Sequence, residues 1–175
     1  MKLVDKSKMH ITSNMKNVKY SNNATSGASW AYFNQCDSRW STQQLGWCEG
    51  YDICHYGCAI SSVSMILATK GVDVNPSSFD VFLSDNGGYI DGCDIVWAMA
   101  DAYGVTSFQG IEYADESAIC DGLAQDHGII ACVNGCTHFV LLTGCLGGGV
   151  FTVNDPAFSR STYSMDEITF EAVYH

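Results

Sequence analysis

The spacing of apolar residues changes character late in the chain, and this change limits the fold more than any other feature of the sequence. Up to about residue 125 apolar side chains recur at helical spacing, which predicts helices over residues 57–70, 77–83, 92–103 and 116–125. Beyond that point, short β-branched and aromatic runs separated by glycines predict antiparallel strands over residues 129–133, 138–143 and 150–154, with a last strand near 169–174. A helical half followed by a sheet half indicates an α+β fold.

The composition limits the class of protein. A chain of 175 residues suits one domain, and 47% apolar and 12% aromatic residues are enough to build a core. No apolar run approaches the ~18 residues that a membrane span needs, so no span is expected. The net charge of −11 repels phosphate backbones, and nucleic acid is therefore excluded as an expected partner.

Residues 1–28 differ from the rest of the chain. They are polar and poor in large apolar side chains, whereas aromatic residues become frequent from Trp30 onward. We predict that residues 1–28 form a poorly ordered leader or linker and that residues 29–175 form the domain.

Nine cysteines is a high and odd number for this length. If one is a working thiol, the other eight could form up to four disulfides, and their pairing stays open. Cys132 and Cys136 flank a turn and could be bonded to each other, while Cys93, Cys120 and Cys145 stand in apolar settings typical of core residues. The cysteine content favours secretion, although residues 1–19 show no signal peptide; reduced cysteines in the cytoplasm are the alternative.

Cys58 directly precedes the most apolar predicted helix, in the sequence Gly57-Cys58-Ala59. The first turn of a helix carries unpaired N–H groups and the positive end of the helix dipole, which favour a thiolate. Cys58 is therefore a candidate nucleophile. The alternative is a cysteine that only fills the core.

His138 and Asp155 are candidates for a base and for the group that orients it. His138 opens one predicted strand, and Asp155, within Asn154-Asp155-Pro156, ends the next. In a hairpin these two positions lie at the same end of the sheet, so the carboxylate could orient the imidazole. Each residue could instead serve only in a turn.

Gln35 is a candidate oxyanion donor, because a neutral amide and a backbone N–H at a helix start can together stabilise the charge that forms when a thiolate attacks a carbonyl. It could also be a surface glutamine.

His55 is a competitor for the base, but a residue just ahead of a helix usually points away from the first turn. A zinc site at Cys48, Cys54 and His55, or at Cys132, Cys136 and His138, lacks a matching second ligand pair. We therefore expect no metal and no cofactor.

Several motifs follow one another in a fixed order: Gln35 to Trp40 (QCDSRW), Gly57 to Leu67 (GCAISSVSMIL), Asn75-Pro76, Trp97, Tyr103-Gly104, His138-Phe139-Val140 and Asn154-Asp155-Pro156. Over residues 32–168 they resemble the bacterial peptidases similar to the bacteriocin-leader (double-glycine) processing protease domain, within the papain-like group. This resemblance implies a papain-like fold with the nucleophile on a helix and the base on a sheet. It also implies Cys58 as nucleophile, His138 as general base and acid, Asp155 as the orienting residue and Gln35 as oxyanion donor. The segment between Gln35 and Cys58 is longer than in many papain-like enzymes.

The sequence thus favours a cysteine peptidase that hydrolyses a peptide bond of a peptide or protein through a thioester intermediate. One alternative is a cell-wall peptide hydrolase, carried by a phage or secreted by a bacterium, since this branch of the family often occurs in such settings. Another is a peptide-binding module that keeps the scaffold without catalysis.

Overall fold

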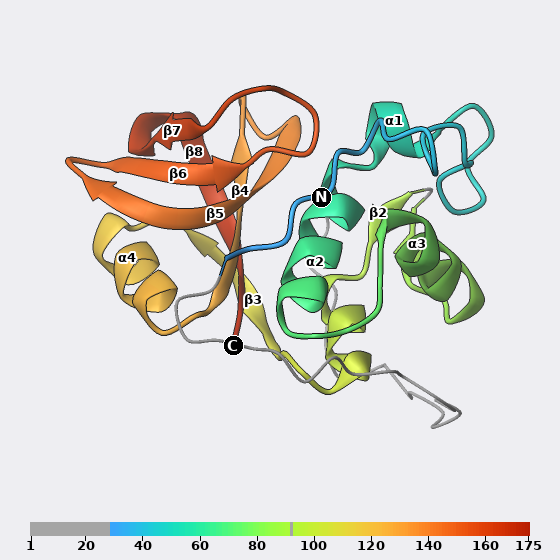
Figure 1. The fold of residues 1–175 in the computed structure, drawn as a ribbon, viewed down its shortest axis with the longest axis horizontal. Coiled ribbons are helices and arrows are strands. Elements are labelled where there is room, and N and C mark those ends of the chain that lie inside the picture. The colour runs from blue at the N-terminus through green and yellow to red at the C-terminus, as the bar shows by residue number, and fades with distance from the viewer. Residues whose placement is uncertain (1–28, 92) are drawn as a thin grey trace.

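The computed structural model describes residues 29–91 and 93–175, so the predicted leader, residues 1–28, lies outside the described residues. The chain forms a helical part and an antiparallel sheet that lie side by side (Figure 1). This arrangement confirms the α+β class.

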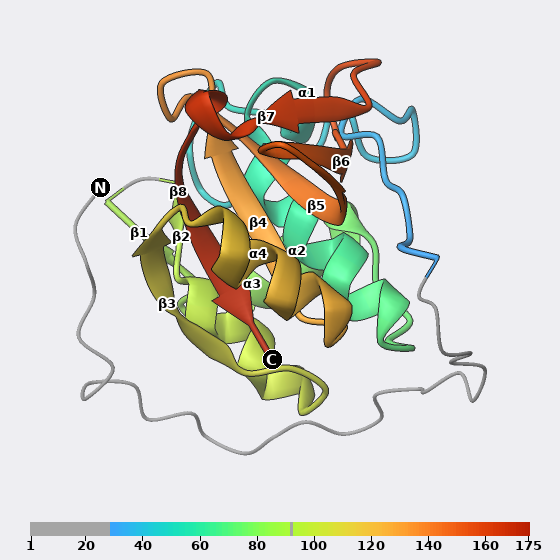
Figure 2. The same cartoon turned by 90° about the vertical axis from the view of Figure 1, so that its left-hand side faces the viewer.

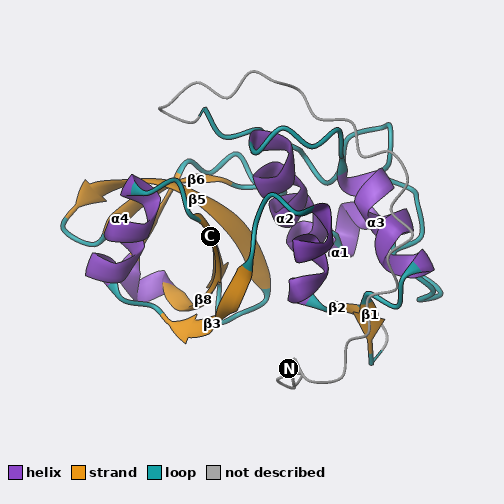
Figure 3. Cartoon of the chain, turned by 90° about the horizontal axis from the view of Figure 1, so that it is seen from below, coloured by secondary structure: helices purple, strands orange, loops and turns teal. Residues whose placement is uncertain are grey.

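The helical part contains three α-helices and a 3-10 helix: α1 (Ile53–Tyr56), α2 (Cys58–Thr69), α3 (Pro76–Asp85) and η2 (Trp97–Tyr103). Between α3 and η2 the short strands β1 (Tyr89–Ile90) and β2 (Asp94–Ile95) pair with each other. Helix α2 lies between α3 and the sheet when the molecule is seen from below (Figure 3).

Helix α2 is held by packing more than by its intrinsic propensity. Its residues from Ile60 to Leu67 are all buried, including the serines at positions 61, 62 and 64. Serine is a mediocre helix former because its hydroxyl competes for backbone hydrogen bonds, and Ser64 indeed donates to the Ile60 carbonyl at 2.8 Å. The burial of this helix fixes the position of its first residue, Cys58.

The sheet has six strands in the order β3-β8-β4-β5-β6-β7. They are β3 (Phe108–Tyr113), β4 (Gly128–Val133), β5 (His138–Gly147), β6 (Val150–Asn154), β7 (Thr162–Ser164) and β8 (Ile168–Tyr174). A one-turn 3-10 helix, η3 (Met165–Glu167), connects β7 to β8, and α4 (Glu116–Ala124) connects β3 to β4. Figure 2 shows α4 in front of the sheet and α2 behind it.

Each face of the sheet packs against a separate hydrophobic core. Ile130 and Leu141 point toward α2 and belong to the larger core, whereas Ile129, Val140 and Leu142 point toward α4 and belong to the second. This alternation follows from the period of two along a strand. Because both faces are covered, the central strands are apolar on both sides, and β4 is buried along its whole length.

Most of the predicted elements are confirmed, with one error. The helices predicted over residues 57–70, 77–83 and 116–125 correspond to α2, α3 and α4, and the four predicted strands correspond to β4, β5, β6 and β8. The helix predicted over residues 92–103 is wrong in its first part, because Asp94 and Ile95 pair with Ile90 and Tyr89. The remainder is the 3-10 helix η2, which ends at Gly104 as predicted.

Eight of the nine cysteines form disulfides: Cys36–Cys54, Cys48–Cys93, Cys120–Cys145 and Cys132–Cys136. The last pair is the one that the sequence suggested. The prediction that Cys93, Cys120 and Cys145 fill the core is wrong, because each forms a disulfide with a cysteine far away in the sequence and none of the three is fully buried. Cys58 is the free thiol.

Glu171 is a buried carboxyl in the middle of β8. Its side chain faces the second core, it stands opposite Glu112 of β3, and its Oε2 atom has no hydrogen-bond partner among the described residues. Burial, and the charges of Glu112 and Asp115, raise the pKa of Glu171 from 4.5 to about 7.

A neutral residue at position 171 should therefore change how stability depends on pH. Between pH 4.5 and 7 the folded state holds a proton that the unfolded state has released, so the native protein loses stability as pH rises through this range. We expect Glu171→Gln to be more stable than the native protein at pH 8, by on the order of 3 kcal/mol, and nearly equal to it at pH 4.5. Urea unfolding at both pH values measures this difference. Exposed Glu49 provides the control, since Glu49→Gln should show no such dependence.

Candidate active site

Cys58 is the first residue of α2 and stands at a tight junction between two helices. Helix α1 ends at Tyr56, and Gly57 both closes α1 through a 2.8 Å hydrogen bond to the Ile53 carbonyl and precedes α2. A Cβ atom at position 57 would lie 2.4 Å from the carbonyl oxygen of Ile53, so only glycine fits here. Among the described residues no side chain caps the N-terminus of α2, and the half-buried thiol of Cys58 lies at this end of the helix beside the first N–H groups, which have no intrahelical acceptor.

The sheet brings His138 and Asp155 to the same end. His138 begins β5 opposite Val133, and Asp155 follows β6 one residue beyond the pairing of Leu141 with Asn154. The Nε2 atom of His138 lies 2.7 Å from Oδ1 of Asp155. The structure therefore brings together the two residues whose proximity the hairpin pattern predicted.

Asp155 is completely buried at its carboxylate and is surrounded by donors. Oδ1 accepts hydrogen bonds from the backbone N–H groups of Ala157 and Phe158, at 2.9 and 3.0 Å, as well as from His138. Oδ2 accepts from the hydroxyl of Tyr163 at 2.9 Å. Burial alone would raise the pKa of Asp155, but the hydrogen bonds from His138, Phe158 and Ala157 outweigh it and hold the pKa below its ordinary value. The carboxylate is therefore charged at neutral pH.

Two partners raise the pKa of His138. Burial favours the neutral ring, but hydrogen bonds to Asp155 and to the side chain of Cys58 outweigh this effect and raise the pKa of His138 to about 9. Since Nε2 is occupied by Asp155, Nδ1 is the ring nitrogen available to Cys58. Cys58, His138 and Asp155 thus form a continuous chain from α2 to the sheet.

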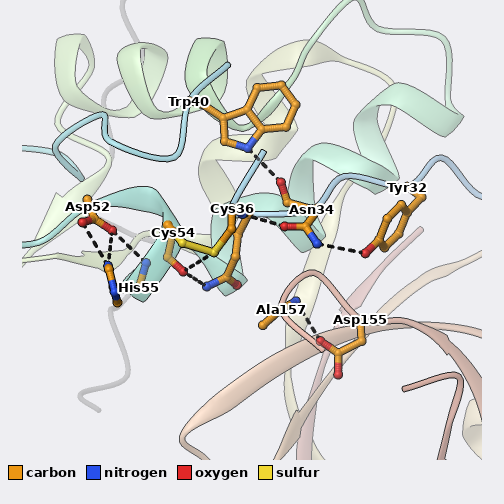
Figure 4. Close-up of a disulfide and its surroundings, with 10 residues drawn as sticks. Tyr32, Asn34, Cys36, Trp40, Asp52, Cys54, His55, Asp155 and Ala157 are labelled. Atoms are coloured by element: carbon orange, nitrogen blue, oxygen red, sulfur yellow. Dashed lines mark hydrogen bonds and ion pairs between the residues drawn. A yellow bond between two sulfur atoms is a disulfide. The ribbon is translucent and has the colours of Figure 1, made fainter. Parts of the chain in front are cut away.

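Gln35 lies close to this chain and is buried. Its backbone N–H donates to the carbonyl of Pro156 at 2.8 Å, next to Asp155, and its Nε2 donates to the carbonyl of Cys54 in α1. Figure 4 shows the neighbouring residues, with Cys36 and Cys54 above Asp155 in the view. The amide nitrogen of Gln35 carries two hydrogens, and the one that is not bonded to the Cys54 carbonyl can donate to another group. Because Gln35 is only 4% exposed, the interpretation of it as a surface glutamine is wrong.

The rival sites have different roles in the structure. His55 is exposed, and its Nδ1 lies 2.7 Å from Oδ1 of Asp52, the residue that caps α1. The cysteines of both zinc hypotheses, at positions 48, 54, 132 and 136, are bonded in disulfides and so cannot act as thiolate ligands. Within residues 29–91 and 93–175, no group of three or more His, Cys, Asp or Glu side chains is placed to hold a metal ion.

Sequence reasoning missed two features of the site. Tyr163, which donates to Asp155, carries no motif, although its alternation with Thr162 and Ser164 in a short aromatic strand is a signal for an inward-facing ring. The Cys36–Cys54 disulfide, which adjoins Gln35, could not be chosen among the possible pairings.

A helix-borne thiol in contact with a buried His–Asp pair is typical of hydrolases that use cysteine as nucleophile. The sequence matches the model of the Peptidase_C39 like family over residues 28–175, and the chain therefore belongs to this family. Membership of this family supports the assignment of the chain as a peptidase that acts on a peptide substrate. A comparison with curated proteins found no match. In the described part of the chain, no helix has the length and apolar character required to cross a membrane.

The hydroxyl of Tyr163 should contribute to stability through Asp155. Tyr163→Phe would leave Oδ2 of a buried carboxylate without its donor, and we expect a loss of about 1–3 kcal/mol in the free energy of unfolding, measured with urea at pH 7. Tyr113 is 91% exposed, so Tyr113→Phe is the matched control and should change stability by less than about 0.5 kcal/mol. Equal effects of the two substitutions would contradict this role of Tyr163.

Proposed function

We propose that this protein is a cysteine peptidase of papain-like architecture in which Cys58 is the nucleophile, His138 the general base and acid, and Asp155 the residue that orients His138. The observation that carries the proposal is the chain of contacts that links the thiol through the imidazole to a fully buried carboxylate. A carboxylate this well supplied with donors keeps Nε2 of His138 engaged, so that Nδ1 is directed to the thiol.

The reaction begins from a thiolate and an imidazolium. The Cys58 sulfur attacks the carbonyl carbon of the scissile peptide bond and forms a tetrahedral oxyanion. The backbone N–H of Cys58, at the open start of α2, and the second Nε2 hydrogen of Gln35 are the groups available to stabilise that oxyanion. His138 then protonates the departing amine and leaves a thioester.

Water completes the cycle. Neutral His138 takes a proton from a water molecule, which attacks the thioester; the second product leaves as an acid, and the Cys58 thiolate and the His138 imidazolium are restored. The burial of Asp155 matters in both halves, because a carboxylate shielded from solvent stabilises each imidazolium that forms.

An ion pair between the Cys58 thiolate and the His138 imidazolium should make Cys58 unusually reactive at acidic pH. An ordinary thiol, with a pKa near 8.5, is almost entirely protonated at pH 6, whereas the raised pKa of His138 keeps the imidazolium in place from pH 6 to about 9. We expect iodoacetamide to alkylate Cys58 at pH 6 at least about tenfold faster in the native protein than in His138→Ala. Mass spectrometry locates the modified residue. Equal rates at pH 6 would rule out activation by His138.

Removal of the sulfur should abolish turnover. We expect Cys58→Ala to lower hydrolysis of a fluorogenic peptide library by at least about 1,000-fold without changing the melting temperature, because the reaction has no other nucleophile. If Cys58→Ala keeps the protein's function, the protein is a binding module. Preference for muropeptides over flexible peptides in the same assay would favour the cell-wall hydrolase.

A further inference from the structure

A disulfide closes the long segment that separates Gln35 from Cys58. Cys36 follows Gln35 directly, Cys54 lies four residues before Cys58, and the Cα atoms of Cys36 and Cys54 are only 4.2 Å apart. Residues 37–53, here called the inserted loop, therefore leave and return at one point. In space, the path from Gln35 to the start of α2 is short, although the sequence between them is long.

The disulfide adjoins the hydrogen bond that orients the Gln35 amide. Nε2 of Gln35 donates to the carbonyl of Cys54, so the disulfide partner of the neighbouring residue is also the acceptor of the Gln35 side chain (Figure 4). Oε1 of Gln35 is buried without a partner among the described residues. The contact with Cys54 is thus the only side-chain hydrogen bond that the described residues give to Gln35, and it depends on how closely Cys36 and Cys54 approach.

The inserted loop is anchored independently of this disulfide. The carboxylate of Asp80 in α3 is buried and accepts from the backbone N–H of Gly46 at 2.8 Å and from Nε2 of Gln43 at 2.6 Å. A separate disulfide joins Cys48 to Cys93. Loss of the Cys36–Cys54 bond should therefore act locally, at the position of Gln35, and leave the loop attached.

The Cys36–Cys54 disulfide is also open to solvent. Cys36 is exposed and Cys54 is half-buried. Exposed disulfides are the ones that small dithiols reduce most readily, whereas buried structural ones resist. Two unbonded thiols need more room than a bonded pair, so reduction forces Cys36 away from Cys54 and from the carbonyl that holds Gln35.

We propose that the Cys36–Cys54 disulfide positions Gln35 as an oxyanion donor and makes turnover by this protein depend on that disulfide being oxidised. This inference rests on the proposed peptidase function, since it assumes that Cys58 attacks a carbonyl. Turnover would be full only while Cys58 is a free thiol and Cys36 is bonded to Cys54.

The switching step is a thiol–disulfide exchange with a small dithiol. The dithiol supplies two electrons and two protons and becomes a cyclic disulfide, while the Cys36–Cys54 bond breaks and each sulfur becomes a thiol. An oxidised dithiol reverses the step with the same balance.

Two probes separate the oxyanion site from the nucleophile. Hydrolysis of p-nitrophenyl acetate passes through a tetrahedral oxyanion, whereas iodoacetamide is displaced at a saturated carbon and forms none. Both reactions would use the Cys58 thiolate, and the rate in Cys58→Ala is subtracted from each. A residue that acts through the oxyanion should affect the ester reaction alone.

We expect Cys36→Ser/Cys54→Ser and Gln35→Ala each to lower kcat for the ester by roughly 10- to 100-fold, with alkylation of Cys58 unchanged within about threefold. The triple variant should be no slower than Gln35→Ala, because the disulfide acts through Gln35. Cys120→Ser/Cys145→Ser is the matched control, since this pair also joins an exposed and a half-buried cysteine but lies between α4 and β5. It should keep full turnover.

Native protein treated with dithiothreitol and then desalted should lose ester turnover in step with reduction of Cys36–Cys54, and should regain it on reoxidation. Full turnover in the Cys36→Ser/Cys54→Ser variant overturns the proposal. The proposal is also overturned if the losses of kcat multiply in the triple variant. The same holds if alkylation of Cys58 falls together with ester turnover, including a fall caused by unfolding. If the native protein itself neither reacts quickly with iodoacetamide at pH 6 nor hydrolyses the ester, the proposed function has failed, which is a separate outcome.

Discussion

The buried carboxylate of Asp155 is the constraint on which the site depends. A charge removed from water is tolerated only when donors surround it, and here two backbone N–H groups, Tyr163 and His138 supply them. The need for these donors fixes the position of the loop after β6, the face of β7 that carries Tyr163 and the orientation of the His138 ring. The geometry at Cys58 is therefore set from the sheet as much as from α2.

Much of this fold could be predicted from local patterns, because both halves have a clear hydrophobic period. The hairpin argument also placed His138 and Asp155 together, since a shared strand end depends only on register and turn position. The helix prediction over residues 92–103 was wrong for a different reason. Asp94 and Ile95 form a strand by pairing with Ile90 and Tyr89 just before them, and a strand of two residues is too short to show an alternating apolar period. The edge strand β3 was missed for a different reason: its partner β8 lies far along the chain, and its residues, interrupted by Gly110, are half-exposed or exposed and show no buried face.

The cysteines show where sequence reasoning stops. An apolar neighbourhood suggested core residues at Cys93 and Cys120, but the same neighbourhood suits a buried or half-buried disulfide, and only the folded chain selects the pairing. The consequence for Gln35 is larger. Its distance from Cys58 in the sequence weakened its comparison with papain-like enzymes, whereas the Cys36–Cys54 crosslink makes that distance irrelevant in space.

The four disulfides have a common property that bears on how the molecule comes apart. Cys36–Cys54 and Cys48–Cys93 lie within the helical part, and Cys120–Cys145 and Cys132–Cys136 lie within the sheet part with α4, so among the described residues no covalent crosslink spans the two. Among the described residues, the larger hydrophobic core and hydrogen bonds such as those from the Gln35 N–H to the Pro156 carbonyl and from Tyr174 to the Trp97 carbonyl hold the two parts together. Cys58 stands on one of these parts and His138 on the other, so reduction of all four disulfides would remove no covalent link between the two residues.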